Sequence, residues 1–176
     1  MQSQPIDRLL ELISIGAGHA AGAFADVVGR TFWMRVPQVR KLDSPSTSVP
    51  RKRRATAVLF EVDGALQGVV ALVLPADAAA ALVRRLVGPE ESVSRELGES
   101  AIRELGNIVV SHVCSAIADT TGARLVPSLP VLVQGDGEAA LLEHAARRGA
   151  ARLLVETEIA DEEGELHGRL VFIPDC

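Results

Sequence analysis

The 176-residue chain is poor in aromatic residues and cysteine. Aromatic side chains make up 3% of it and hydrophobic residues 48%, so the sequence predicts a core of Leu, Val, Ile and Ala. Cys114 falls inside a predicted helix and Cys176 is the last residue. Two cysteines so placed make neither a disulfide framework nor a metal site. The formal net charge of −5 argues against a nucleic-acid-binding surface.

Long apolar segments are also missing. The first residues, Met-Gln-Ser-Gln-Pro, include no basic region that leads into an apolar stretch, which argues against a signal peptide. The apolar run 66–74 is too short to span a bilayer. We therefore expect a cytoplasmic protein with no membrane partner, long enough to bury a substantial core as a single domain.

Asparagine occurs once, at Asn107, within a predicted helix over 94–120. Asn is unfavourable inside helices because its amide competes for backbone partners, so a single Asn at this place suggests a function. Ser100, Glu104, Asn107 and Pro130 are separated by three, two and twenty-two residues. The same spacing recurs 93 residues earlier, at Asp7, Glu11, Ser14 and Pro37.

A second echo supports an internal duplication. The segment 63–68 (DGALQG) resembles 163–168 (EGELHG), and each precedes an apolar run that ends in proline. Two copies are too few for a solenoid, so we expect one domain over 1–176 with an approximate twofold. Repeat one covers about 1–88 and repeat two about 94–176.

The local patterns predict an α+β fold in which two long helices pack on a sheet built from both repeats. The helices are expected over 5–28, 76–86, 94–120 and 138–148. The strands are expected over 31–40, 56–62, 66–74, 124–133, 152–159 and 165–173. The polar segment 42–54, which includes the basic run 51–54, is expected to be a solvated loop.

On the second long helix, Ser100, Glu104, Asn107 and Ser111 fall within an arc of about 60°. His112 falls on the opposite side, among the apolar residues expected to face the core. The corresponding residues of the first helix, Asp7, Glu11, Ser14 and Gly18, share one phase in the same way. An exposed Glu and Asn on a helix usually serve only solvation, but the repetition of the same polar face favours a function. Pro130 by itself is expected to be structural.

Other features carry weaker signals. The glycines at positions 16, 18 and 22 lack the spacing of a phosphate-binding loop and better fit close helix packing. The four histidines, at positions 19, 112, 144 and 167, lack metal-ligand spacing. Cys114 is expected to serve packing rather than chemistry.

The pattern [Asp/Ser]-x3-Glu-x2-Asn-x22-Pro, complete around ELGNIVVSHV and altered at one position around ELISIGAGHAAGAF, resembles that of the CheC/CheX/FliY-type phosphatases of chemotaxis. The resemblance covers nearly the whole chain. It implies that Glu104 and Asn107 form the catalytic pair, with Ser100 and Pro130 as supporting positions. Ser14 stands where the motif has Asn, so the resemblance implies a degenerate second site at Asp7, Glu11, Ser14 and Pro37.

The resemblance also implies a substrate and partners. The substrate would be a phosphorylated CheY-type response regulator, and the deamidase CheD is a further candidate partner. We expect no cofactor of the chain's own, with any magnesium held by the receiver domain of the regulator. The alternative is a non-catalytic binding module of the same fold, similar to flagellar-switch relatives, that docks a response regulator or CheD.

Overall fold

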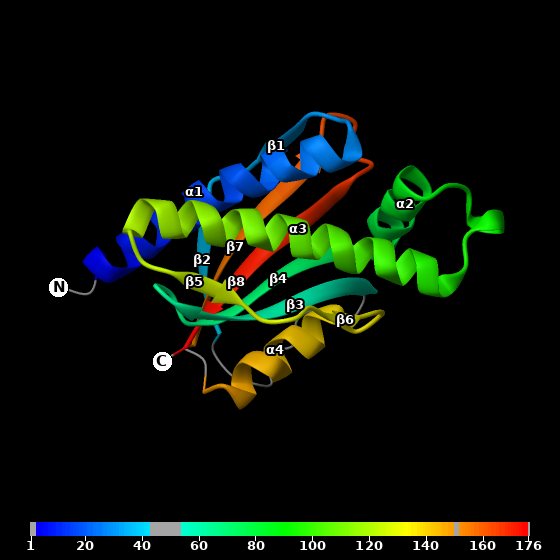
Figure 1. Cartoon of the computed structure of the whole chain (residues 1–176). Coiled ribbons are helices and arrows are strands. Elements are labelled where there is room, and N and C mark those ends of the chain that lie inside the picture. Colours follow the sequence, from blue (N-terminus) through cyan, green and yellow to red (C-terminus); the bar gives the residue numbers. More distant parts are fainter. Residues whose placement is uncertain (1–2, 43–53, 150–151, 176) are drawn as a thin grey trace.

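The computed structural model describes residues 3–42, 54–149 and 152–175 (Figure 1). In chain order the elements are α1 (Ser3–Val28), β1 (Phe32–Met34), β2 (Gln38–Lys41), β3 (Ala55–Gly64), β4 (Gly68–Pro75), α2 (Ala76–Leu86), a short 3-10 helix η1 (Glu90–Ser92), α3 (Arg95–Thr121), β5 (Leu125–Pro127), β6 (Val131–Val133), α4 (Gly137–Arg147), β7 (Leu153–Asp161) and β8 (His167–Pro174). The predicted α+β class is confirmed, because helices and a single antiparallel sheet make up the described chain.

The sheet interleaves the two halves of the chain. Its strand order is β1-β7-β8-β4-β3-β5, while β2 also pairs with β7 and β6 also pairs with β3. The short strands of each half therefore pair with the long hairpin of the other half. The two hairpins meet at the central β4–β8 pair, so each half lacks a complete sheet of its own.

The register of this central pair reveals an approximate twofold. In the antiparallel β4–β8 ladder, Ala71 lies opposite Val171, Val70 opposite Phe172, and Leu72 opposite Leu170. Residues 71 and 171 differ by 100 and lie opposite each other. If every residue is exchanged for the one 100 positions away, the pair Val70–Phe172 becomes the pair Leu170–Leu72. The offset that relates the two hairpin sequences is thus also the one that relates the two central strands. The central strands of the sheet are thus related by an approximate internal twofold, and the duplication of the chain stays a prediction.

Helices cover both faces of the sheet (Figure 1). Helices α1 and α3 pack side by side and run antiparallel on one face, and α4 packs on β3 and β4 from the other face. Alternate residues of β3 accordingly enter two cores: Val58 and Phe60 face the long helices, whereas Ala57 and Leu59 face α4. The structure adds this third layer to the predicted arrangement of two helices on a sheet, and it explains why β3 and β4 read as continuous apolar runs.

The predicted continuous strands over 31–40 and 124–133 are wrong, because each is broken into two short strands. The breaks contain Pro37 and Pro130, which have no N–H to donate to a ladder. Just before each proline the chain is tied to the neighbouring long strand in the same way. Arg35 N donates to Glu158 O at 2.9 Å, and Ser128 N donates to Glu61 O at 2.8 Å.

The helix ends follow local sequence signals. Ser94 caps α3 by accepting a hydrogen bond from Leu97 N at 3.2 Å. Gly122 ends α3 in the left-handed conformation at φ +66°. Most of the predicted loop 42–54, including positions 51–53 of its basic run, lies outside the described residues. None of the helices in the described part of the chain is long and apolar enough to cross a membrane.

Candidate functional site

The residues of the complete motif lie on the outer face of α3. Ser100 and Glu104 are exposed, and Asn107 and Ser111 are half-buried. The opposite side of the helix is buried in the core between helices and sheet, through residues that include Ile102, Leu105, Gly106, Val109, Val110 and Val113. His112 was expected on that buried side but is exposed, because its position on the helix falls at the edge of the buried stripe.

The side chains of Glu104 and Asn107 have no hydrogen bond or ion pair with any other described residue. A free carboxamide offers two N–H donors and a carbonyl oxygen that accepts, and a free carboxylate offers acceptors only. The two residues are spaced i, i+3, so they are neighbours on the helix surface. Their full hydrogen-bonding capacity is therefore available to a partner.

Gly106, next to the asparagine, lets α3 approach the sheet closely. A Cβ at this position would lie 2.7 Å from Cγ1 and 2.8 Å from Cβ of Val58, which is on β3. Such distances are too short for carbon atoms in contact. The absence of a side chain at Gly106 thus fixes the depth at which this turn of α3, and with it Asn107, sits on the sheet.

Pro130 lies half-buried in the break between β5 and β6. Both of these short strands pack against α3, so the proline belongs to the segment that borders the helix. The preceding Ser128 is held from both sides, because Glu61 N donates to its hydroxyl at 3.0 Å while its own N–H donates to Glu61 O. This geometry suits a supporting role for Pro130.

The altered motif occupies the corresponding places of the first half. Asp7 and Glu11 are exposed on α1, and Ser14 is half-buried one turn further along. Pro37 is buried in the break between β1 and β2. The two motifs therefore lie on neighbouring antiparallel helices of one layer.

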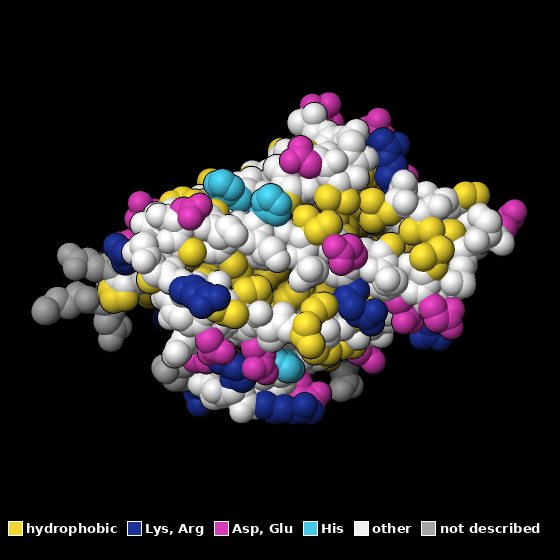
Figure 2. All heavy atoms as spheres, in the orientation of Figure 1, with side chains coloured by type: hydrophobic (Ala, Val, Ile, Leu, Met, Phe, Trp, Pro, Cys, Tyr) yellow, Lys and Arg dark blue, Asp and Glu magenta, His cyan; other side chains and the backbone are white. Residues whose placement is uncertain are grey.

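Sequence reasoning missed further residues that the 93-residue offset would have found. The exposed His19 of α1 corresponds to the exposed His112 of α3. Figure 2 shows histidine side chains on the surface of the helix layer. Val36 and Leu129 are also related by this offset, and they are exposed by 80% and 86%, each just before its motif proline. Both halves thus present an apolar side chain beside the break in the sheet edge.

Other groups are less suited to chemistry. Cys114 is buried on α3, and burial raises the pKa of its thiol to about 11, so the thiolate is scarce at neutral pH. In the described part of the chain, no group of three or more His, Cys, Asp and Glu residues is arranged to hold a metal ion. The site on α3 therefore consists of a carboxylate, a carboxamide and hydroxyls on a rigid helix.

Known proteins resemble this chain both in the sequence around the complete motif and in fold. The CheC-like family model matches residues 97–133, which contain the complete motif. The chain is 29% identical over 192 aligned residues to the CheY-P phosphatase CheC of Bacillus subtilis, with 99% of this chain and 90% of that protein covered. The fold is similar to the crystal structure of Thermotoga maritima FliY, with a TM-score of 0.71, 18% identity and coverage of 97% and 89%.

A further similar structure is the CheX–CheY–BeF3–Mg2+ complex of Borrelia burgdorferi, with a TM-score of 0.63, 15% identity and coverage of 94% and 97%. The chain is therefore similar to CheC-like proteins in sequence, through residues 97–133 and through the 29% identity over nearly its whole length, and its fold is similar to those of the FliY and CheX structures. The predicted family resemblance is confirmed.

Proposed function

We propose that this protein is a phosphatase that hydrolyses the aspartyl phosphate of a phosphorylated CheY-type response regulator in chemotaxis signalling. The observation that carries the proposal is the pair Glu104 and Asn107, adjacent on one rigid helix and without partners among the described residues. The phosphatase relative at 29% identity supports the same activity.

The chemistry of the pair suits this reaction. Hydrolysis of an acyl phosphate by an in-line water needs positioning and charge stabilisation more than covalent help from the protein. The carboxamide of Asn107 accepts a hydrogen bond from the attacking water and donates one to the phosphoryl oxygens, in the way that a glutamine orients water in small GTPases. Glu104 pairs with a lysine near the phosphorylated aspartate and holds the complex in register.

Magnesium would belong to the regulator rather than to this chain. Mg2+ prefers an octahedral set of oxygen ligands, which the carboxylates and phosphate of a receiver domain supply. The similar CheX complex contains both CheY and Mg2+. In the proposed complex, Asn107 and Glu104 act from the opposite side of the phosphoryl group and need not ligate the ion.

The rate of phosphate loss from a purified phospho-receiver tests the proposal. A CheY-type receiver from the same genome is phosphorylated with acetyl phosphate in the presence of Mg2+, freed of the donor, and followed with and without this protein. We expect catalytic amounts of the protein to accelerate the loss of phosphate. An unchanged rate with a receiver that demonstrably binds the protein would contradict a phosphatase.

The second candidate is a non-catalytic module that docks a response regulator or CheD. Ser14 favours it, because the first half keeps the position of the motif asparagine but not the amide. The similar fold of FliY fits both readings. Binding of the phospho-receiver without turnover, by the intact chain, would support this second candidate.

A further inference from the structure

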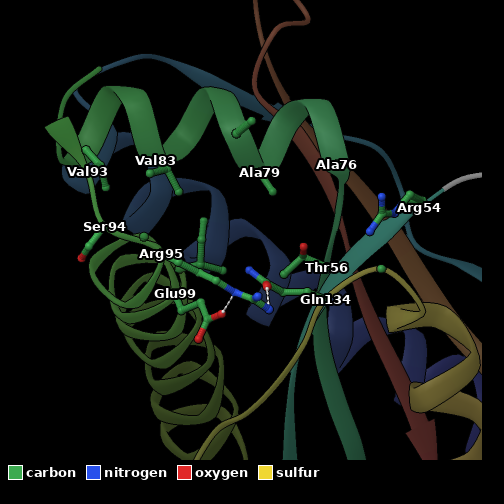
Figure 3. Close-up of a pocket in the computed structure, with 14 residues that line it drawn as sticks. Arg54, Thr56, Ala76, Ala79, Val83, Val93, Ser94, Arg95, Glu99 and Gln134 are labelled. Atoms are coloured by element: carbon green, nitrogen blue, oxygen red, sulfur yellow. Dashed lines mark hydrogen bonds and ion pairs between the residues drawn. The ribbon is translucent and has the colours of Figure 1, made fainter. Parts of the chain in front are cut away.

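A cavity lies between α2, the first turns of α3 and the start of β3 (Figure 3). Its volume is about 360 Å³, which is within the range of sites for small molecules. None of Ser100, Glu104, Asn107 and Pro130 lines it. It is therefore separate from the proposed phosphatase site, although both use α3.

The walls of this cavity divide by polarity. The apolar wall is made by Ala79, Ala80, Val83, Val93 and Ile102. The polar wall is made by Arg54, Thr56, Ser94, Arg95, Glu99 and Gln134. Such a division suits a ligand with a polar head and a short apolar body.

Thr56 is the feature that points to a ligand. Only 7% of the surface of Thr56 is exposed. Its hydroxyl has no hydrogen bond with any described residue. In Figure 3 the hydroxyl points toward α2, into the cavity. The Thr56 hydroxyl is not among the fully inaccessible polar atoms that lack a partner in the described chain, so it can be reached from the cavity and can donate a hydrogen bond to a ligand there.

The charges on the polar wall indicate the charge that a ligand should carry. The guanidinium of Arg95 is already engaged, by Glu99 at 2.9 Å and Gln134 at 3.5 Å. Arg54 forms no ion pair with any other residue that the structure describes. Among the described residues, one positive charge, that of Arg54, therefore lines the cavity without a counter-charge.

Helix α2 adds to this positive potential. It follows Pro75, which provides no side-chain cap, and its first N–H is tied to Arg54 O at 3.0 Å. The N-terminal end of a helix carries a partial positive charge that favours anions. Arg54 and the start of α2 are thus adjacent, and both line the cavity together with Thr56.

We infer that this cavity binds a small amphipathic anion. A carboxylate or phosphate monoester head would be held by Arg54 and Thr56, and a short alkyl body would lie against Ala79, Val83 and Ile102. This binding is independent of the proposed phosphatase activity, because it requires neither the receiver domain nor the motif residues.

Calorimetric titration of the full chain with three six-carbon probes tests the inference. We expect hexanoate or hexyl phosphate to bind saturably at one site, and the tighter of the two identifies the head group. Hexylammonium has the same body but the opposite charge and is expected not to bind. Absence of saturable binding by both anions, or equal binding of hexylammonium, would overturn the inference.

Two variants locate the binding. Arg54→Gln is expected to raise the Kd of the more tightly bound anion by about tenfold or more, because a charged hydrogen bond is lost. Thr56→Val keeps the shape of the side chain and is expected to raise the Kd of the same anion by about fivefold. Thr56→Val should also leave the melting temperature of the unliganded protein unchanged or raised, since the hydroxyl lacks a protein partner. As a control, Arg124 is exposed in the turn after the far end of α3, and the Arg124→Gln variant should bind as the wild type does. Unchanged affinity in both cavity variants would place the ligand elsewhere and refute the site.

Discussion

Helices α1 and α3 occupy corresponding places in one layer, yet they differ at the residue that the proposed mechanism needs. Asp7 and Glu11 on α1 match Ser100 and Glu104 on α3 in spacing and in exposure. At the next motif position α3 has the amide of Asn107, whereas α1 has the shorter hydroxyl of Ser14. A hydroxyl has a single donor and less reach than a carboxamide. Both helices thus carry the acidic or polar positions of the motif, and only α3 has the amide.

The two helices also differ in the residue just before that position. Gly106 in α3 allows contact with Val58, whereas the corresponding Ile13 of α1 is a large buried side chain. In α1 the close approach occurs instead at Gly16, where a Cβ would lie 2.8 Å from Cγ1 of Val113 on α3. The turn of α3 that carries Asn107 therefore lies close to the sheet, whereas the closest glycine contact of the motif-bearing part of α1 is with α3.

Removal of the amide is expected to have the largest effect. Asn107→Ala should reduce dephosphorylation of the receiver by at least about a hundredfold, by analogy with the loss of one preorganised hydrogen-bond donor. The fold should persist because alanine is a better helix former than asparagine. The measurement is single-turnover phosphate loss, with circular dichroism as the control for folding. A folded variant that keeps the wild-type rate would remove Asn107 from the mechanism.

Glu104 is expected to act through docking. Glu104→Ala should raise KM for the phospho-receiver by about tenfold, because a charge pair at an interface is lost. Glu104→Lys should be worse than Ala, since it places a positive charge against the proposed lysine of the partner. Steady-state kinetics of both variants measures the difference. Equal KM values for Ala and Lys would argue against an ion pair.

Exchange of one residue between the halves tests whether the first site lacks only its amide. Ser14→Asn in the Asn107→Ala background is expected to restore part of the turnover, because Glu11 and Asp7 already hold the corresponding positions on α1. The substitution is near the surface and should change the free energy of unfolding by no more than about 0.5 kcal/mol. The rate is compared with that of Asn107→Ala alone. A double mutant that binds the phospho-receiver without turnover would mean that the first site has lost more than the amide.

Much of the fold could be predicted from short-range signals. The helix 76–86 has the predicted bounds, and Ser94 and Gly122 end α3 where cap chemistry indicates. The breaks at Pro37 and Pro130 were missed, because apolar residues alternate up to Pro37 and alternate across Pro130, so each segment looks like one strand. The position of α4 could not be predicted either, since its amphipathic pattern does not say which face of a sheet it covers.

The residues of the candidate site could be predicted from the sequence, but the tertiary contacts around them could not. The spacing around Asn107 revealed the polar stripe of α3. Nothing in the local sequence indicated that Gly106 would contact Val58, because these residues come together only in the folded sheet. The cavity was missed for the same reason. Thr56 reads as an ordinary strand residue, and its unpaired hydroxyl becomes visible only when α2 and α3 enclose it.

The last predictions concern stability first and come from two glycines that distinguish the helices. Gly22 of α1 is exposed, and a Cβ there would meet nothing within 4 Å. Gly22→Ala should therefore raise the free energy of unfolding by about 0.5–1 kcal/mol, through helix propensity alone. Gly106→Ala should lower it by about 1–3 kcal/mol, because the added methyl group meets Val58 and must push α3 away from β3.

Urea unfolding of both glycine variants measures this contrast, and turnover measures its consequence. Since the displaced turn of α3 also holds Asn107, Gly106→Ala should lose activity, whereas Gly22→Ala should keep it. If Gly106→Ala were as stable as Gly22→Ala, the close seating of α3 on β3 would not exist in solution. If it were less stable but fully active, the depth of α3 would matter for the fold and not for the placement of Asn107.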